Sequence, residues 1–175
     1  MLRLQNPSLE LFPSYLDYLT ELVAEDYSYF NEIKSIQNNA ENYLKTIQEW
    51  QNGLNLPTGF VSETRLWLTL EDQVLGVFSI RHRLNSRYLK ISGHIGYSII
   101  PSRRRNGYAT AGLKLTLDYI LQHPKLDLKR VLITCDSDNI ASKKVIEKCG
   151  GVLENKSFDF LRFKVKLRFW IDLKS

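Results

Sequence analysis

The chain has 175 residues, of which 43% are apolar and 25% charged, which is typical of one globular domain over residues 1–175 and excludes a disordered protein. No apolar run is as long as a membrane span or a signal peptide, so we expect a cytoplasmic protein with no membrane partner. The formal net charge of +5 is spread over basic clusters at 103–105, 143–144 and 162–168; this is more typical of a solvated surface than of a nucleic-acid-binding face, and no nucleic-acid partner is expected.

The first third of the chain is predicted to be mainly helical. Residues 2–4 can form a short strand, and apolar residues spaced by three and four positions predict a helix over 14–23. Asn39 is a suitable N-cap for a second helix, whose apolar stripe ends at Trp50. Glycine, asparagine and proline over 53–59 then predict a loop.

Strands follow this loop. Alternating apolar residues predict a hairpin made of 66–70 and 74–81. After a polar connection, a further strand is predicted over 94–100, which Pro101 ends. Apolar residues spaced by four then predict a helix over 107–121.

The last third alternates between strand and helix. The short apolar run 130–135 predicts a strand buried on both faces. A helix over 140–149 follows, capped by Asp138 or Asn139. Apolar and basic side chains alternate over 162–171, which predicts a closing strand.

This order predicts an α/β fold with a mixed, mostly antiparallel central sheet and helices on both of its faces. The strand–helix–strand segment 94–135 predicts one right-handed parallel crossover. Cys135 and Cys149 each fall inside a predicted element and are expected to be buried, reduced thiols. No group of residues has the spacing of metal ligands, so no metal is expected.

The stretch 93–117, GHIGYSIIPSRRRNGYATAGLKLTL, carries the clearest chemical signal. It runs from a strand through an arginine-rich loop into a helix whose first turn holds Gly107 and Ala109. The first N–H groups of a helix lack internal partners and the helix dipole adds partial positive charge, so a diphosphate is a suitable ligand. Small residues let it approach the backbone, and Arg104 and Arg105 add charged donors at the rim. A solvated loop that only packs helix against strand explains the same residues.

Residues 104–109, RRNGYA, resemble the cofactor motif Gln/Arg-x-x-Gly-x-Gly/Ala of the GNAT superfamily of N-acetyltransferases. Downstream, Asn139, Ser142 and the segment 147–150 resemble that family's asparagine, small residue and E-K-x-G segment. The predicted order of elements also agrees with the family fold over nearly the whole chain. The resemblance implies acetyl-CoA as cosubstrate and transfer of its acetyl group to a primary amine of a small molecule or a peptide. The resemblance does not decide whether the protein forms a homodimer.

The same resemblance assigns the contacts with the cofactor. Backbone groups of the strand before the loop hold the pantetheine arm, N–H groups of the loop and first helical turn hold the pyrophosphate, and the later helix adds two side chains. These residues are Ile99 and Ile100 for the arm; Arg104, Arg105, Asn106, Gly107, Tyr108, Ala109 and Thr110 for the pyrophosphate; and Asn139 and Ser142 from the helix. Asn139 is equally explained as a helix cap.

The chain departs from the family pattern in its general acid. Many members carry a tyrosine just before the E-K-x-G segment that protonates the departing thiolate, and this chain has Ile146 there. Tyr97 and Tyr108 lie nearby in sequence. Either another group acts as the acid, or the thiolate leaves without a proton.

The family's sequence pattern does not identify the general base either. His94 lies on the strand where the family often places Glu or His, and its usual pKa suits removal of a proton from an amine. Side chains alternate between the two faces of a strand, so His94 and Tyr97 lie on opposite faces. If the strand is oriented as is usual in the family, Tyr97 faces the acceptor and His94 does not. The alternative is a histidine whose hydrogen bonds serve only the structure. Other candidates are His82, Glu25 and Asp26, for which structural or solvated roles serve as well.

The leading hypothesis is therefore an acetyl-CoA-dependent N-acetyltransferase. The missing tyrosine keeps open a catalytically silent acyl-CoA-binding module. A nucleic-acid-binding domain that uses the basic clusters lacks any recognisable reading motif.

Overall fold

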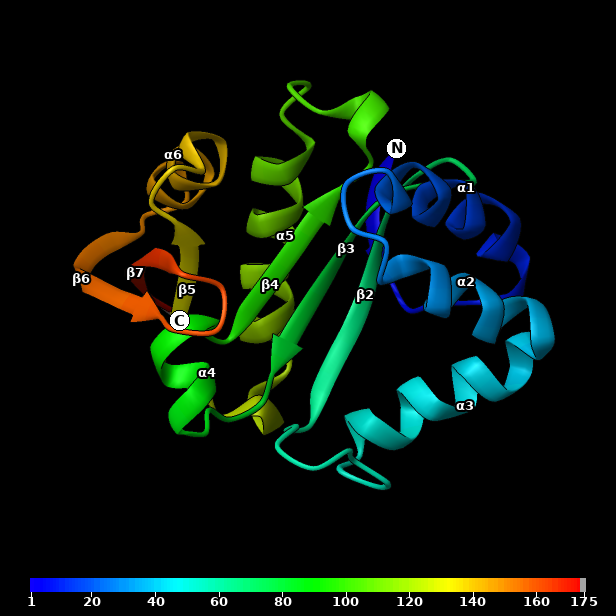
Figure 1. Ribbon diagram of the computed structural model, residues 1–175, viewed down its shortest axis with the longest axis horizontal. Coiled ribbons are helices and arrows are strands. Elements are labelled where there is room, and N and C mark those ends of the chain that lie inside the picture. The colour runs from blue at the N-terminus through cyan, green and yellow to red at the C-terminus, as the bar shows by residue number, and fades with distance from the viewer. Residues whose placement is uncertain (174–175) are drawn as a thin grey trace.

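The computed structural model describes residues 1–173, in which one seven-stranded sheet carries helices on both faces (Figure 1). The strand order in the sheet is β1-β2-β3-β4-β5-β7-β6. The strands are β1 Leu2–Gln5, β2 Glu63–Leu70, β3 Gln73–Arg81, β4 Ile95–Ile99, β5 Arg130–Asp136, β6 Val152–Asp159 and β7 Lys164–Asp172. The α-helices are α1 Phe12–Val23, α2 Tyr29–Asn38, α3 Ala40–Gln51, α4 Ser86–Ile91, α5 Tyr108–Gln122 and α6 Ile140–Lys148.

All neighbouring strands are antiparallel except β4 and β5, which confirms the mixed sheet with one parallel crossover through α5. β4 and β5 pair only at Ile95 and Ile133. Beyond this point the two strands diverge toward their carboxyl ends, and an opening separates the β1–β4 half of the sheet from the β5–β7 half (Figure 1).

The two faces of the sheet are covered by different helices. Trp67 on β2 stacks on Tyr15 of α1, with ring centroids 4.1 Å apart. The next residue, Leu68, points to the other face, where a Cβ added at Gly112 of α5 would lie 3.1 Å from its side chain and 2.2 Å from that of Phe78. Since α5 has no side chain at this crossing, it packs directly on the sheet. β2 is thus buried on both faces.

The predicted elements are confirmed, and two helices are absent from the sequence-based prediction. The sequence predicts one or two closing strands, and the structure has two, β6 and β7. α2 has apolar residues at helical spacing, Tyr29, Ile33 and Ile36, but only Ile36 is fully buried and the other two pack partly exposed against the core. α4 is six residues long and lies in the polar connection after β3, where the Asn85 side chain accepts the Tyr88 N–H at 2.9 Å. β6 is exposed along most of its length, so it shows no alternation of apolar and polar residues.

Within residues 1–173, none of the helices combines the length and the apolar character that crossing a lipid bilayer requires.

Candidate functional site

The opening between β4 and β5 exposes backbone groups of β4. The N–H of Ile100 donates to Leu75 of β3 at 2.9 Å, so alternation turns the N–H groups of Tyr97 and Ile99 away from β3 toward the opening. The Ile99 carbonyl accepts a hydrogen bond from Arg104 Nε at 3.0 Å. The Ile100 carbonyl accepts one from the following loop. Both polar backbone groups of Ile100 are therefore used within the protein, and its predicted contact with pantetheine finds no support, whereas the Ile99 N–H faces the opening.

The loop after β4 enters α5 through two residues in the left-handed region. The φ angles of Arg105 and Gly107 are 66° and 80°. A Cβ at Gly107 would meet no atom within 4 Å, so glycine is favoured there by its backbone angle alone. The first N–H bonded at the start of α5 is that of Ala111, and the N–H groups of 105–110 have no hydrogen-bond partner among residues 1–173. They gather at the positive end of the α5 dipole, which suits an anion with several oxygens.

Arg104 does not point to this anion site but anchors the loop to Glu25, in the turn just after α1. Its Nη1 and Nη2 atoms donate to the two carboxylate oxygens of Glu25 at 2.5 and 2.7 Å. One turn earlier on α1, Glu21 accepts the N–H and hydroxyl of Ser102, both at 2.8 Å. The Arg104 hydrogen bond lowers the pKa of Glu25, so this carboxylate is an ion-pair partner and not a free base. Arg105 is the exposed arginine at the rim.

The Asn106 side chain also supports the loop. Its Nδ2 atom donates to the carbonyls of Arg103 and Arg104, both at 3.1 Å, so only its backbone N–H faces a ligand. The stretch 108–110, predicted from Tyr108 to Thr110, forms the first turn of α5. The Thr110 carbonyl accepts a hydrogen bond from the Cys149 thiol at 3.7 Å, which ties the end of α6 to α5.

The start of α6 borders the same opening. The Asn139 side chain accepts the Ser142 N–H at 2.9 Å, so Asn139 is a helix cap, and its contact with a cofactor stays a prediction. The Ser142 hydroxyl lies 2.8 Å from that of Tyr97, which reaches across from β4. Burial raises the pKa of Tyr97 to about 12. Ile146, one turn after Ser142, is completely buried.

His94 lies at the closed end of the opening. Its Nδ1 atom accepts the N–H of Leu132 at 2.9 Å, and its side chain is buried near the Trp170 ring. Burial, and then the charges of Arg81 and Arg130, lower the pKa of His94 to about 4. The imidazole is thus neutral near pH 7, but the nitrogen that could accept a proton already accepts a hydrogen bond. This geometry matches a structurally satisfied histidine and gives no support to a role as the base.

The other candidate bases also form hydrogen bonds within the protein. His82 follows β3, which antiparallel pairing places at the opposite end of the sheet from the opening, and its Nε2 atom lies 2.9 Å from the Thr64 hydroxyl. Asp26 accepts the Ser28 N–H at 2.9 Å, and hydrogen bonds from Ser28 lower the pKa of Asp26. Among residues 1–173, no group of three or more His, Cys, Asp or Glu side chains could hold a metal ion.

Sequence reasoning missed a buried polar cluster between α1, α2, α3 and β2. Glu32 accepts hydrogen bonds from Tyr15 at 2.9 Å, from Arg65 at 3.0 Å and from Tyr43. Arg65 also lies 3.3 Å from Glu63. The available signal was the position of Arg65 directly before the apolar run 66–68 of β2, because a guanidinium drawn into the protein requires a carboxylate partner.

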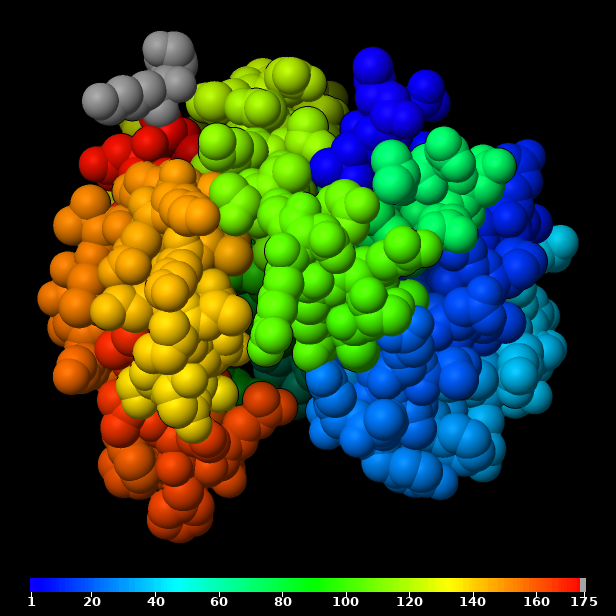
Figure 2. Space-filling model, turned by 90° about the horizontal axis from the view of Figure 1, so that it is seen from above, coloured from blue at the N-terminus to red at the C-terminus, as the bar shows by residue number. Residues whose placement is uncertain are grey.

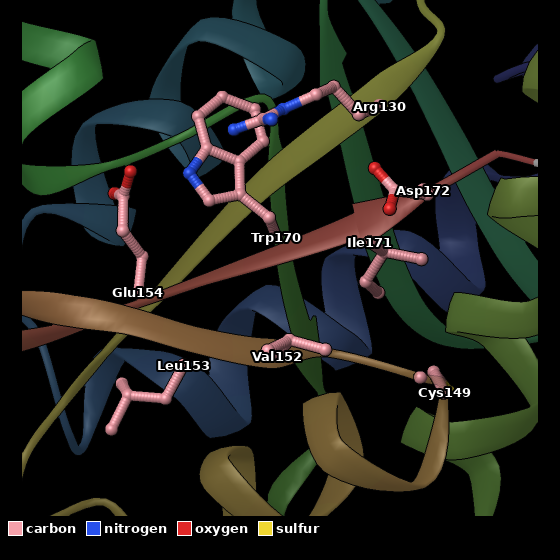
Figure 3. A pocket seen from close by; sticks show the side chains of 9 residues that line it. Arg130, Cys149, Val152, Leu153, Glu154, Trp170, Ile171 and Asp172 are labelled. Carbon is pink, nitrogen blue, oxygen red and sulfur yellow. The ribbon is translucent and has the colours of Figure 1, made fainter.

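Figure 2 looks down on the carboxyl ends of β4 and β5. The hollow there lies between α6 (yellow), the loop after β4 (green), the α1–α2 region (blue) and the tip of the β6–β7 hairpin (orange). A separate depression of about 600 Å³ lies on the outer side of β5 and β7 (Figure 3). There the Arg130 guanidinium lies 3.7 Å from the centre of the Trp170 ring. Arg130 begins β5, so this depression is at the opposite end of the strand from the anion site.

Comparison with known proteins agrees with this geometry. Residues 2–152 match the sequence profile of the acetyltransferase (GNAT) domain. The uncharacterized N-acetyltransferase YjdG of Bacillus subtilis (strain 168) is 30% identical over 66 residues, which are 38% of this chain and 38% of that protein.

Two solved structures share the fold over nearly the whole chain. RimL, the ribosomal L7/L12 alpha-N-protein acetyltransferase in complex with coenzyme A, superposes with a TM-score of 0.69 at 17% identity, covering 98% of this chain and 94% of that one. The microcin C7 self immunity acetyltransferase MccE, in complex with acetyl-CoA and AMP, gives 0.68 at 14% identity, covering 98% and 92%. Because the profile spans most of the sequence and the split sheet with its anion-binding helix start is present, the chain belongs to the GNAT acetyltransferase family.

Proposed function

We propose that this chain transfers the acetyl group of acetyl-CoA to a primary amine. The observation that carries the proposal is the row of unpartnered N–H groups over 105–110, at the start of α5 and beside the opening between β4 and β5. A diphosphate needs several converging donors, and an extended amide-containing arm needs a strand with free backbone groups. Here the two features are adjacent.

The residues present fit both the diphosphate and the pantetheine arm of acetyl-CoA. The amides of 105–110 would hold the diphosphate, with the Arg105 side chain at the rim, and the N–H groups of Tyr97 and Ile99 would bind the pantetheine arm. Acetyl-CoA supplies a thioester carbonyl that a neutral amine can attack. The protein's part is to hold the two reactants in line, which alone contributes a large share of the rate.

Tyr97 is our proposed proton donor to the departing sulfur. Its hydroxyl lies beside the opening and is held by Ser142 at 2.8 Å. With its pKa raised to about 12, the phenol stays protonated near pH 7 and can donate a hydrogen bond. His94, Glu25 and Asp26 are each engaged elsewhere, so we propose that the amine loses its proton to water.

Calorimetric titration with acetyl-CoA tests the anion site through Gly107→Val. A β-branched residue at a φ of 80° distorts the loop, and we expect affinity to fall at least tenfold while the fold is retained, because a Cβ there meets no atom. Gly53→Val is the matched control, since Gly53 has a φ of 75°, equal space and a place on a remote loop. Unchanged affinity in Gly107→Val would contradict the site.

Ile146 motivates a second candidate, a module that binds acyl-CoA without turnover. A side chain that cannot donate a proton occupies the family's tyrosine position and is completely buried. A thiol-release assay with pooled primary amines separates the two functions: turnover supports the enzyme, and tight binding with no turnover supports the module.

A further inference from the structure

The turn between β6 and β7 exposes four large apolar side chains. Phe160, Leu161 and Phe163 are 78%, 77% and 80% exposed, and Phe158 is 41% exposed. The Phe158 ring meets the rings of Phe160 and Phe163 edge-on, at centroid distances of 4.9 and 6.3 Å. Phe158, near the end of β6, and Phe160 and Phe163 in the turn form one contiguous aromatic surface. These three residues and the exposed Leu161 beside them in the sequence are called the hairpin-tip patch.

The hairpin-tip patch lies at the mouth of the opening. The Ser137 N–H, just beyond β5, donates to Val165 at 2.8 Å, and Lys164 lies 2.5 Å from Asp138 at the start of α6. These contacts fix the beginning of β7 beyond the carboxyl end of β5. In Figure 2 the hairpin tip faces the α1–α2 region across the hollow.

A second aromatic surface lies on that facing side. Tyr27, which is 69% exposed, stacks on Phe30 with ring centroids 5.2 Å apart. The acidic group nearby is Asp26, whose pKa is lowered in part by the charge of Arg162 on the hairpin. The mouth therefore has an apolar surface on each side, an acidic group on one side and a basic group on the other.

The size of the hairpin-tip patch decides what kind of acceptor it suits. One aromatic side chain covers about 150–250 Å² when buried, so three rings and a leucine at these exposures present several hundred Å² of apolar surface. Single exposed apolar residues are ordinary, but a contiguous area of this size marks a binding surface. A small amine with one ring would leave most of it in water, whereas several consecutive residues of a peptide would cover it.

The charge around the hairpin-tip patch distinguishes between a polyamine and a peptide as the acceptor. Arg162 lies within the turn, whereas Lys164, which directly follows it, is paired with Asp138. A polyamine brings further positive charges against Arg162, which costs free energy. A peptide with one α-amine and uncharged apolar residues behind it avoids this repulsion, and Asp26 attracts its single ammonium group.

We propose that the acceptor is a polypeptide whose α-amino group enters the opening and whose next few residues are apolar or aromatic. Those residues pack between the hairpin-tip patch and the Tyr27–Phe30 pair. This assignment rests on the acetyltransferase function proposed above.

Two synthetic peptides of equal length and charge test the assignment, one beginning Ala-Phe-Leu-Phe and one beginning Ala-Ser-Gln-Ser, both without lysine. Thiol release and mass spectrometry at saturating acetyl-CoA give kcat/KM for each. We expect at least a tenfold preference for the apolar peptide. The triple variant Phe160→Ser, Leu161→Ser, Phe163→Ser should lose that preference while its affinity for acetyl-CoA is unchanged.

Val152→Ser is the matched control, because this side chain is 71% exposed at the other end of β6. It should keep the preference for the apolar peptide. Circular dichroism checks that the exposed substitutions leave the fold intact.

The outcomes separate the two proposals. Equal kcat/KM for both peptides in a wild-type protein that binds acetyl-CoA and acetylates them overturns the peptide assignment alone. Failure of wild-type protein to bind acetyl-CoA overturns the proposed function. A dimer that the triple variant breaks, with peptide preference unchanged, assigns the hairpin-tip patch to a second copy of the chain and also overturns the peptide assignment.

Discussion

Tyr97 gives the chain a phenol at the opening although the usual tyrosine position is occupied by Ile146. Ser142 and Ile146 lie one turn apart on α6, and the Tyr97 hydroxyl lies 2.8 Å from that of Ser142. The hydroxyl is thus held beside α6 but is attached to β4. Sequence reasoning placed Tyr97 on the right strand, but only the folded chain shows that its hydroxyl reaches the second helix, 45 residues away.

The Tyr97→Phe variant tests the proton donor. The phenyl ring keeps the stacking on Phe78, whose ring centroid lies 5.6 Å away, so the fold should hold. We expect kcat to fall about 100-fold, within the range of general acid catalysis, with little change in KM for acetyl-CoA. Ser142→Ala, which removes only the partner of the phenol, should cost less. Steady-state thiol release measures both, and a wild-type kcat in Tyr97→Phe would exclude this role.

Single residues of the anion site differ in how far the sequence predicts them. Gly107 and the amides around it follow from linear spacing, because a helix start binds anions through its own backbone. The partner of Arg104 does not, since Glu25 is 79 residues away and any of the exposed carboxylates could have paired with it. The phosphate site therefore stays a prediction that the sequence alone can make, whereas the ion pair of Arg104 with Glu25 is seen only in the folded chain.

At the scale of elements, α1 and the loop after β4 act as one unit. Glu21 in the last turn of α1 holds Ser102, and Glu25 in the turn just after α1 holds Arg104, so this segment fixes the loop at two points. The helices that periodicity predicts well, such as α5, have a broad buried face. α2 has a single buried residue and is not found by periodicity, although it supplies Glu32 to the buried cluster.

Glu25→Gln tests whether α1 holds Arg104 back from the ligand. Glu21 and the contact of Arg104 Nε with Ile99 still anchor the loop, while the two Nη atoms lose their charged partner and a negative charge near the anion site is removed. We expect acetyl-CoA to bind about two- to tenfold more tightly, with the gain diminishing at high salt. The ion pair is largely exposed, so stability should change by less than about 1 kcal/mol.

The matched control is Glu41→Gln, which removes one exposed charge on α3. Calorimetric titration at two salt concentrations should show unchanged affinity in this variant. If Glu25→Gln and Glu41→Gln bind acetyl-CoA equally well, the ion pair does not restrain Arg104.

At the scale of the whole molecule, the two halves of the sheet meet at very few contacts. β4 and β5 pair at Ile95 and Ile133, and His94 adds two hydrogen bonds with Leu132, one through its backbone N–H at 2.6 Å and one through its ring at 2.9 Å. The separation of β4 from β5 thus leaves a short junction between the two halves, and a titratable side chain forms part of it.

This junction should make stability depend on pH. In the folded chain the pKa of His94 is about 4, whereas an unfolded histidine titrates near its ordinary pKa of 6.5. Between these values the unfolded chain binds a proton that the folded chain does not, so the free energy of unfolding falls as pH decreases from 6.5 toward 4. The full loss attributable to His94 is on the order of 3 kcal/mol.

His94→Asn isolates this contribution, because its Oδ1 atom can still accept the Leu132 N–H but the side chain does not titrate. Urea unfolding of both proteins at pH 7 and pH 4.5 gives the comparison, in which carboxylate titrations common to both cancel. We expect wild-type protein to lose more stability than His94→Asn over this range. Parallel losses would mean that protonation of the junction histidine does not limit the cohesion of the split sheet, and that the acid sensitivity resides in carboxylates such as Glu25, whose pKa is lowered by the hydrogen bond from Arg104.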